Sequence, residues 1–497
     1  MSKDPFTLDM FGNTALSSGL GLGITAFGSF SAPANDDEPE PTPPAPAAPL
    51  SVRTTKEPPR RQGRRANFYL DSEDRGLATS WKERARMNVA AIVTANEIEN
   101  RNIPVTREHQ RKLIRFTGFG ASELANGMFR RPGEMEFRKG WDDIGTSLET
   151  AVSESDYASL ARCTQYAHFT PEFIIRAIWS GLQRLGWRGG RILEPGIGTG
   201  LFPALMPESY RDNSFVTGIE LDPVTARILG LLQPKARILN MDFARTDLAP
   251  IYDLAIGNPP FSDRTVRSDR KYRKLGLRLH DYFIARSIEL LKPGALAAFV
   301  TSSGTMDKAD ATAREHIARS ADLIAAIRLP ERSFRRDAGT DVVVDILFFR
   351  KRKVGQAEGD HAWLDLEEVR PATEDERVIR VNRWFARHPS LVLGDHALTS
   401  GPFGETYTCL PSTGEDLEVA LQEAIALLPE GVYDGEPTPV DIDLAEELGD
   451  IVDLRAGNGM IREGSFVIDN GRGLMQMLDG SAVPVTVRKG RSGDGIS

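Results

Sequence analysis

The sequence has only two cysteines in 497 residues, Cys163 and Cys409, and they lie far apart. This scarcity excludes a disulfide framework and a zinc ribbon. The seven histidines show no paired metal-ligand spacing, so we expect no metal. No apolar run approaches the roughly 18 residues needed to span a membrane. The amino terminus has an acid at Asp4 and no continuous apolar stretch, which predicts no signal peptide and a cytoplasmic protein without a membrane partner.

Positive charge is also in short supply, because the chain carries a net charge of −9. The deficit is local: segment 415–450 contains twelve acidic residues and no lysine or arginine. Removing those twelve negative charges leaves +3 on the rest of the chain, where basic clusters occur at 53–65 and 264–278. The net negative charge therefore does not exclude a positive surface that attracts nucleic acid. Solvated loops are the alternative, and the first cluster fits that interpretation equally well.

The composition divides the chain into four segments. Residues 1–65 are rich in glycine, serine and then proline, which predicts a disordered tail and linker. Residues 66–160 show helical periodicity and are predicted to form a helical N-terminal domain. Residues 161–355 alternate short apolar strands with helices, the pattern of a doubly wound α/β sheet. Residues 356–497 are irregular, which predicts a small α+β extension that includes the acidic segment 415–450.

Several elements can be predicted by residue number. The sheet strands are expected at 191–194, 215–220, 237–239, 253–257, 295–301, 323–329 and 342–349. Further helices are expected at 106–116, 279–291 and 416–428, with short strands at 465–468 and 483–487. Ser80 and Glu83 predict a capping box at the start of a helix. The apolar face of this helix is expected to consist of Met87, Ala90, Ala91, Val93 and Ile98.

A glycine-rich loop follows the first predicted strand, with glycines at 196, 198 and 200. Glycines at a strand end let the backbone turn tightly and approach a ligand closely. The dinucleotide fingerprint would need a further glycine at position 201, which is leucine, and no P-loop lysine is present. Glu194 directly precedes the loop instead, where a carboxylate could face a cationic amino-acid group.

Acidic residues also end the next two strands. Glu220 lies 26 residues after Glu194, where an acid accepts hydrogen bonds from both ribose hydroxyls in nucleotide-binding α/β folds. After the third strand, Asp242 offers an acceptor for an adenine amino group and Phe243 offers a ring to stack on it.

Together these features resemble S-adenosylmethionine-dependent methyltransferases. Upstream, Phe169-Thr170-Pro171 is similar to the aromatic-Thr-Pro element with which amino-methyltransferases cap the cofactor, and it precedes the glycine loop as in the gamma-type order. The resemblance implies the class I methyltransferase fold, with a seven-stranded, mostly parallel, doubly wound sheet and S-adenosylmethionine as cofactor. For Phe169, a core aromatic before a helix-starting proline is the alternative.

The run Asn258-Pro259-Pro260-Phe261 follows the fourth predicted strand, where ligands bind outside a parallel sheet. The amino nitrogen of adenine is a poor nucleophile because its lone pair is delocalised into the ring. Two acceptors, the Asn258 side-chain oxygen and the Pro259 carbonyl, would favour a pyramidal nitrogen and release that lone pair. The prolines stiffen the turn, and Phe261 would stack on a base that has left the duplex. A purely structural turn is the alternative.

The basic loop begins three residues after Phe261, a position that suits contacts with DNA phosphates around a flipped nucleotide. Its candidate DNA-binding residues are Arg264, Arg267, Arg270, Lys271, Arg273 and Lys274. His280 follows at the start of a helix, where we interpret it as a packing or capping residue; a catalytic role is the alternative.

Within the amino-methyltransferases, the chain resembles the large plasmid- and phage-borne N6-adenine DNA methylases that are often fused to a helicase. The shared motifs lie at 116–120, 166–171, 194–196, 258–261, 328–330, 339–340, 345–347, 384–385, 388–389 and 394. The resemblance implies DNA as substrate, adenine N6 as acceptor, and roles in restriction–modification or antirestriction. The sequence departs from the family in ending at Ser497 without a Walker motif, so a separately encoded helicase is the expected partner. Because the acidic segment lies where a target-recognition domain would follow, we expect weak sequence specificity from this chain alone.

Two other functions remain open. Methylation of RNA guanine N2 or of a protein glutamine also uses Asn-Pro-Pro-aromatic turns, and a DNA-binding antirestriction protein could carry a vestigial methylase. Near the amino terminus, Leu8 and Phe11 fall in a peptide that resembles sliding-clamp ligands, with a chance pentapeptide as the alternative.

Overall fold

The computed structural model describes residues 66–70, 74–130, 134–166, 169–370, 378–401 and 404–438, together with three short strands between 466 and 484. The predicted tail and linker at 1–65, with the clamp-like peptide at Leu8 and Phe11, lie outside the described residues. Among the helices that are described, none is long and apolar enough to cross a membrane.

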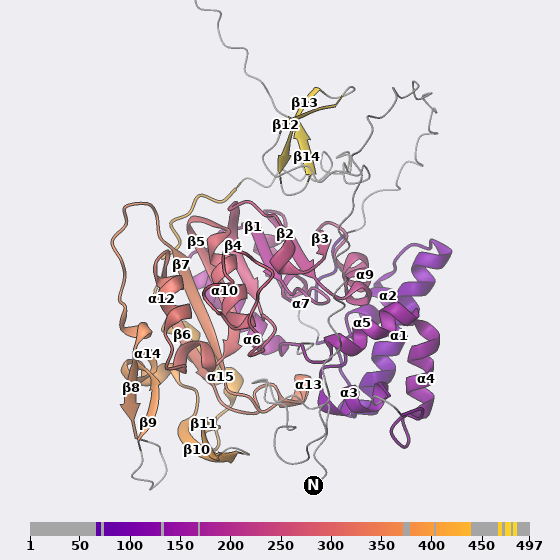
Figure 1. Cartoon of the computed structure of the whole chain (residues 1–497), viewed down its shortest axis with the longest axis horizontal. Helices are drawn as coiled ribbons and strands as arrows, with labels where there is room; N and C mark the ends of the chain where they lie inside the picture. Colours follow the sequence, from indigo (N-terminus) through magenta and orange to yellow (C-terminus); the bar gives the residue numbers. More distant parts are fainter. Residues whose placement is uncertain are drawn as a thin grey trace, which may run out of the picture.

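A seven-stranded sheet forms the centre of the chain, in the order β3-β2-β1-β4-β5-β7-β6 (Figure 1). Only β7 runs antiparallel to its neighbours, between β5 and β6. This order with one reversed strand is that of the class I methyltransferase fold, as predicted. The strands are β1 (Gly190–Pro195), β2 (Ser214–Glu220), β3 (Arg237–Asn240), β4 (Tyr252–Gly257), β5 (Leu291–Ser302), β6 (Ala321–Leu329) and β7 (Val344–Lys351).

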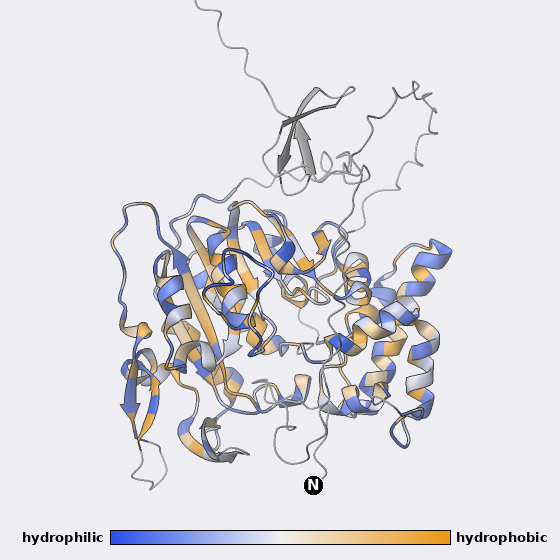
Figure 2. Cartoon of the chain, in the orientation of Figure 1, coloured by the Kyte–Doolittle hydropathy of each residue, from blue (hydrophilic) through white to orange (hydrophobic). Residues whose placement is uncertain are grey.

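Helices cover both faces of the sheet, and apolar residues are concentrated along its strands (Figure 2). Alternate residues of each strand point to opposite faces, so Ile192 enters one core and Leu193 the other. The first core contains α6 (Glu172–Arg184), α7 (Leu201–Ala204), α9 (Pro223–Leu232) and α15 (Leu417–Ala426). The second contains α10 (Leu279–Glu289), α11 (Gly304–Asp307) and α12 (Thr312–Ala318). Two further short helices are α8 (Glu208–Arg211) and α13 (Arg335–Ala338).

The first five described helices gather beside the β3 end of the sheet (Figure 1). They are α1 (Trp81–Arg101), α2 (Arg107–Leu113), α3 (Ser122–Met128), α4 (Asp142–Ala151) and α5 (Glu154–Cys163). Their buried residues belong to the same core as one face of the sheet, and α5 runs across the predicted boundary at 160. The predicted capping box is wrong, because the Ser80 side chain makes no capping hydrogen bond; Thr106 and His109 form one at α2 instead.

Beyond β7 the chain forms small elements. They are β8 (Leu366–Val369), β9 (Ile379–Asn382), α14 (Arg383–Arg387), β10 (Asp395–Gly401), β11 (Gly404–Leu410), β12 (Phe466–Asp469), β13 (Gly473–Leu478) and β14 (Ser481–Pro484). The acidic helix α15 packs on α6, and the chain after it follows the amino-terminal edge of the sheet. There Tyr433 N–H donates to Leu185 O, and Lys292 Nζ lies 2.7 Å from Asp253 Oδ1 and 2.6 Å from Glu436 O. The described part of the acidic segment therefore lies at the edge opposite the carboxyl ends of the strands.

Candidate active site

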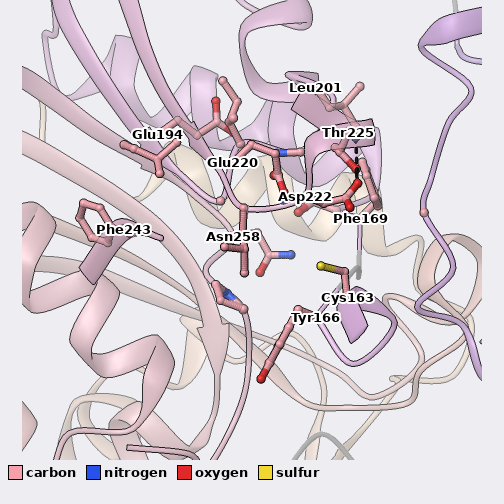
Figure 3. Close-up of a pocket in the computed structure, with 18 of the residues that line it drawn as sticks. Cys163, Tyr166, Phe169, Glu194, Leu201, Glu220, Asp222, Thr225, Phe243 and Asn258 are labelled. Atoms are coloured by element: carbon pink, nitrogen blue, oxygen red, sulfur yellow. Dashed lines mark hydrogen bonds between the residues drawn. The ribbon is translucent and has the colours of Figure 1, made fainter. Parts of the chain in front are cut away.

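A cavity of about 320 Å³ opens at the carboxyl ends of β1, β2 and β4, between the sheet and the N-terminal helices (Figure 3). Ten of the residues predicted for the site line it: Phe169, Thr170, Glu194, Gly196, Gly198, Glu220, Asp242, Phe243, Asn258 and Pro260. Four others do not: Pro171, Gly200, Pro259 and Phe261. Most of the sequence-predicted cofactor residues are thus brought together, from strands that are distant in the sequence.

The glycine loop adopts a backbone that only glycine takes easily, with φ of +75° at Gly196, +58° at Gly198 and +76° at Gly200. Gly198 N–H donates to Glu220 Oε2 over 2.9 Å, and a Cβ at Gly198 would stand 3.2 Å from the Phe169 ring. A Cβ at Gly200 would stand 2.7 Å from Leu229 Cδ1 of α9. Gly196 and Gly198 therefore shape the cavity, whereas Gly200 lets the helix pack closely behind the loop.

Glu194 presents a buried carboxylate to the cavity. Glu194 lies near the end of β1, and the residue is only 2% exposed. Its Oε2 accepts no hydrogen bond from any residue that the structure describes. Burial raises the Glu194 pKa well above its usual range, and the neighbouring Glu220 carboxylate raises it further. A buried acceptor without a donor is costly, so the geometry fits a cationic ligand group at this position.

Glu220 and Asp222 end β2 and begin α9. Glu220 Oε1 accepts a hydrogen bond from Asp222 N–H over 2.8 Å, and burial raises the Glu220 pKa to about 7 against the opposing effect of this bond. Asp222, which the sequence analysis missed, caps α9 through Thr225 N–H and accepts a hydrogen bond from Ser159 Oγ of α5 over 2.7 Å. The Asp-Pro pair at the start of a helix was the available signal, since Pro223 suits a first helical position.

Asp242 and Phe243 follow β3; Asp242 caps a turn and is partly exposed, whereas Phe243 is buried in the second core. Asp242 Oδ1 caps a 3₁₀ turn through Ala244 N–H, and its side chain is 44% exposed. The Phe243 ring is buried, 5.0 Å from the Phe283 ring centroid, with the Arg286 guanidinium 4.7 Å from its own centroid. Phe243 reaches the cavity as part of the second core, so its stacking on an adenine remains a prediction.

The Asn-Pro-Pro-Phe turn divides between the cavity and the core. Gly257, with φ of +150°, starts the turn, and a Cβ there would stand 3.4 Å from Glu194 Cγ. Asn258 and Pro260 then face the cavity, and Asn258 lies in its centre in Figure 3. Phe261 is 7% exposed and packs edge-on against His280, with ring centroids 6.1 Å apart.

His280 therefore acts as a packing residue rather than as a lining residue of the cavity. Burial lowers its pKa, which favours the neutral ring. The capping part of our interpretation is wrong, because the cap position of α10 is Arg278, which makes no capping hydrogen bond.

Other cavity residues come from the N-terminal helices and were not assigned to the site from the sequence. Phe116, Gly118 and Phe119 line it from the loop after α2, and Cys163 and Tyr166 line it from the end of α5. The buried Asn88 holds this loop, accepting a hydrogen bond from Thr117 N–H over 2.8 Å and donating to Gly118 O. All of these cavity residues except Cys163 lie in the motifs at 116–120 and 166–171, which the sequence analysis noted. The sequence of a motif alone does not show which of its residues face a ligand.

The basic loop at 264–278 is held by buried residues, whereas most of its arginines and lysines are exposed. Buried Tyr272 donates to Glu289, and Asp269 accepts hydrogen bonds from Tyr282 Oη over 2.9 Å and from Arg286. Lys271 pairs with Glu289, and Arg264 donates to Tyr166 Oη over 3.2 Å. The exposed side chains without a hydrogen bond or ion pair to any described residue are Arg267, Arg270, Arg273 and Lys274.

No group of three histidine, cysteine, aspartate or glutamate side chains within the described ranges could hold a metal ion. Burial raises the pKa of the Cys163 thiol to about 12, so this cavity residue stays protonated and is not a nucleophile near neutral pH.

No protein-family model matches the chain. Parts of it are similar to three curated proteins. The Defense against restriction protein B of Escherichia phage P1 is 28% identical over 197 residues, which are 38% of this chain and 8% of that protein. Type II methyltransferase M.XamI of Xanthomonas campestris pv. amaranthicola is 28% identical over 162 residues, 28% of this chain and 30% of that protein. Type II methyltransferase M.CvrRI of Paramecium bursaria Chlorella virus XZ-6E is 30% identical over 192 residues, 38% of this chain and 48% of that protein.

The chain thus spans less than half the length of each of these relatives. Among solved structures, the M protein of the type I restriction enzyme EcoKI matches 56% of this chain and 64% of its own, with 19% identity and a TM-score of 0.29. N-methyltransferase NodS from Bradyrhizobium japonicum WM9 matches 36% of this chain and 97% of its own, with 13% identity and a TM-score of 0.27. The chain has the class I methyltransferase fold, and part of its sequence resembles restriction–modification methyltransferases and a phage antirestriction protein.

Proposed function

We propose that this chain is an S-adenosylmethionine-dependent DNA methyltransferase that methylates an exocyclic amino group, adenine N6. One observation carries the proposal: the amide of Asn258, the buried carboxyl of Glu194 and the partly buried carboxyl of Glu220 line one cavity of about 320 Å³. Its size suits a nucleoside-sized cofactor. The relatives named as type II methyltransferases support the DNA substrate.

The residues fit the cofactor in three ways. Glu194 offers an acceptor without a donor to the ammonium group of the methionine part. Glu220 offers a carboxylate to the ribose hydroxyls, and Asp242 offers an acceptor beyond it for the adenine amino group. When bound, the cofactor supplies a methyl group on a positively charged sulfur.

The residues of the turn would prepare the acceptor amine. The Asn258 side-chain oxygen would accept a hydrogen bond from one of the amine's N–H groups, and the Pro259 carbonyl, although Pro259 does not line the cavity in this structure, would accept one from the other. These two hydrogen bonds would favour a pyramidal nitrogen with an available lone pair. With the cofactor bound, its positively charged sulfur would supply the methyl group to this lone pair, and the methylated amine would lose one proton to solvent. Because the methylated amine is positively charged at that moment, a strong general base is unnecessary.

The proposal is tested with purified protein, radiolabelled S-adenosylmethionine and separate DNA, RNA and protein acceptors. We expect label in DNA, and N6-methyladenine after digestion of that DNA to nucleosides. If N4-methylcytosine is found instead, the proposed DNA methyltransferase activity stands, but the target base is cytosine and not adenine. Label confined to RNA or protein would favour the alternative acceptors, and label in none of them would contradict the proposed activity.

We also propose that the basic loop binds DNA phosphates. Replacing Arg267, Arg270, Arg273 and Lys274 together by alanine should weaken binding to every DNA sequence. The slope of log affinity against log salt should fall by roughly 0.9 for each phosphate that the variant no longer neutralises. Fluorescence anisotropy with labelled duplexes over a range of salt concentrations measures both effects.

The matched control is Lys271→Ala, because its ammonium is already paired with Glu289 and should contribute less to phosphate binding. An unchanged salt slope in the fourfold variant would show that the loop is merely solvated. A separately encoded helicase and a sliding clamp remain proposed partners, and the clamp-like peptide lies outside the described residues.

A further inference from the structure

The aromatic residue of the Asn-Pro-Pro-Phe turn presents no open face to the cavity. Phe261 is 7% exposed, and the edge of one ring meets the face of the other where it packs on His280. His280 is itself 2% exposed, which fixes the contact within the core. For Phe261 to stack on a base, its ring would have to leave this packing.

Tyr166 presents an aromatic ring where Phe261 does not. It is partly exposed and lines the cavity together with Asn258 and Pro260 (Figure 3). It comes from the chain just after α5, whereas Asn258 and Pro260 follow β4. A flat ligand held by Asn258 would therefore meet the Tyr166 ring.

The hydroxyl of Tyr166 is tied to the basic loop. Arg264 Nη1 donates to Tyr166 Oη over 3.2 Å, and the Arg264 side chain is exposed. The first arginine after the turn therefore connects the surface that would meet DNA phosphates with a ring inside the cavity.

We propose that Tyr166 is the surface on which the target base stacks, and that Arg264 holds the ring in place through the hydroxyl. This inference rests on the proposed function, since it names the residue that receives the base. Stacking of a base on an aromatic ring is tolerant of base identity, so Tyr166 adds affinity and position, while Asn258 contacts the amino group.

The test compares Tyr166→Leu, which removes the ring, with Tyr166→Phe, which removes only the hydroxyl. We expect Tyr166→Leu to lower kcat/KM for DNA methylation roughly 30-fold and Tyr166→Phe to lower it about threefold. Cofactor affinity and thermal unfolding should stay near the wild-type values in both. The matched control is Tyr69→Leu, which removes a partly buried tyrosine outside the cavity and should leave kcat/KM unchanged.

A second measurement does not depend on methyl transfer. A duplex with 2-aminopurine opposite an abasic position lets the base leave the helix at little cost, and stacking on an aromatic ring quenches its fluorescence. At saturating protein, the Tyr166→Leu complex should be at least about threefold brighter than the wild-type and Tyr166→Phe complexes. Equal brightness in all three, or full methylation activity in Tyr166→Leu, would overturn the inference. A wild-type protein that quenches the base but transfers no methyl group would instead contradict the proposed function.

The role of Arg264 is tested by a double-mutant cycle with Arg264→Gln and Tyr166→Phe. If the hydrogen bond couples the two residues, the double variant should be only slightly less active than the less active of the two single variants. Fully additive losses would show that Arg264 acts without Tyr166.

Discussion

Replacing Asn258 by alanine should abolish measurable methyl transfer, lowering kcat by roughly 100- to 1000-fold or more, while cofactor affinity changes by no more than a few-fold. The two acceptors of the turn act on the amine only as its nitrogen becomes pyramidal, so removing one raises the barrier without weakening the bound ground state. Single-turnover transfer of labelled methyl groups measures the first effect, and titration calorimetry with S-adenosylmethionine measures the second.

The matched control for this substitution is Asn213→Ala, which removes a partnered asparagine at the opposite edge of the sheet, where its side chain donates to Arg188 O over 2.6 Å. This control should retain activity. A loss of cofactor binding in Asn258→Ala would show that the amide belongs to the cofactor site, and the division of roles proposed for the cavity would then be wrong.

Much of the sheet could be predicted, because buried parallel strands are short apolar runs between helices. The predicted ends of β1, β2, β4 and β6 agree closely with the structure. β5 begins at Leu291, four residues before its predicted start, because the Lys-Pro-Gly interruption at 292–294 hides its continuation. The resemblance implied a mostly parallel sheet but did not say which strand is reversed, since strand direction depends on how the chain crosses over and leaves no local pattern.

The N-terminal helices were harder to predict because their cores include polar groups. Ala90 and Val93 were expected on the buried face of α1, yet both are exposed, whereas Arg84 and Asn88 are buried. Arg84 donates to Asp337 O and Asn88 supports the loop at 117–118, so long-range hydrogen bonds determine which face turns inward. Hydrophobic periodicity carries no information about such partners.

Some motif residues proved structural rather than functional. Arg328 is fully buried, pairs with Asp345 through two hydrogen bonds of 2.8 Å, and lies 2.7 Å from Asp307. A Cβ at Gly394 would stand 2.3 Å from Leu410 O, so this glycine permits close packing of β11. Arg328 thus joins β6 to β7 and α11, and Gly394 packs within the extension. The spacing of these residues in the sequence could not distinguish such structural roles from catalysis.

The second large effect is expected from Glu194→Gln, which keeps the shape of the side chain and removes its charge. We expect the affinity for S-adenosylmethionine to fall roughly 30- to 100-fold, because a charge-assisted hydrogen bond in a buried site becomes a neutral one. The matched control is Glu208→Gln, an exposed residue of α8 outside the cavity. Its affinity should equal that of the wild type.

The raised pKa values of Glu194 and Glu220 predict a second measurable effect, a pH dependence of cofactor binding. Burial raises the Glu220 pKa to about 7, so the Glu220 carboxyl is mostly protonated at pH 6 in the cofactor-free protein. Burial also raises the Glu194 pKa well above its usual range, which favours the protonated form of that carboxyl as well. A cationic cofactor favours their ionised forms, so binding should release protons and strengthen as the pH rises through 7. Calorimetry in buffers of different ionisation enthalpy counts the released protons.

Glu194→Gln should reduce this proton release and flatten the pH dependence that remains, leaving only the part that belongs to Glu220. The charge of the ligand, rather than a change in the fold, would then be the cause, since the variant keeps the buried volume and its amide oxygen can still accept a hydrogen bond. Wild-type affinity that is independent of pH between 6 and 8, or a variant that binds as tightly as the wild type, would show that the cation lies elsewhere in the cavity. The unpartnered Oε2 of Glu194 would in that case need another donor.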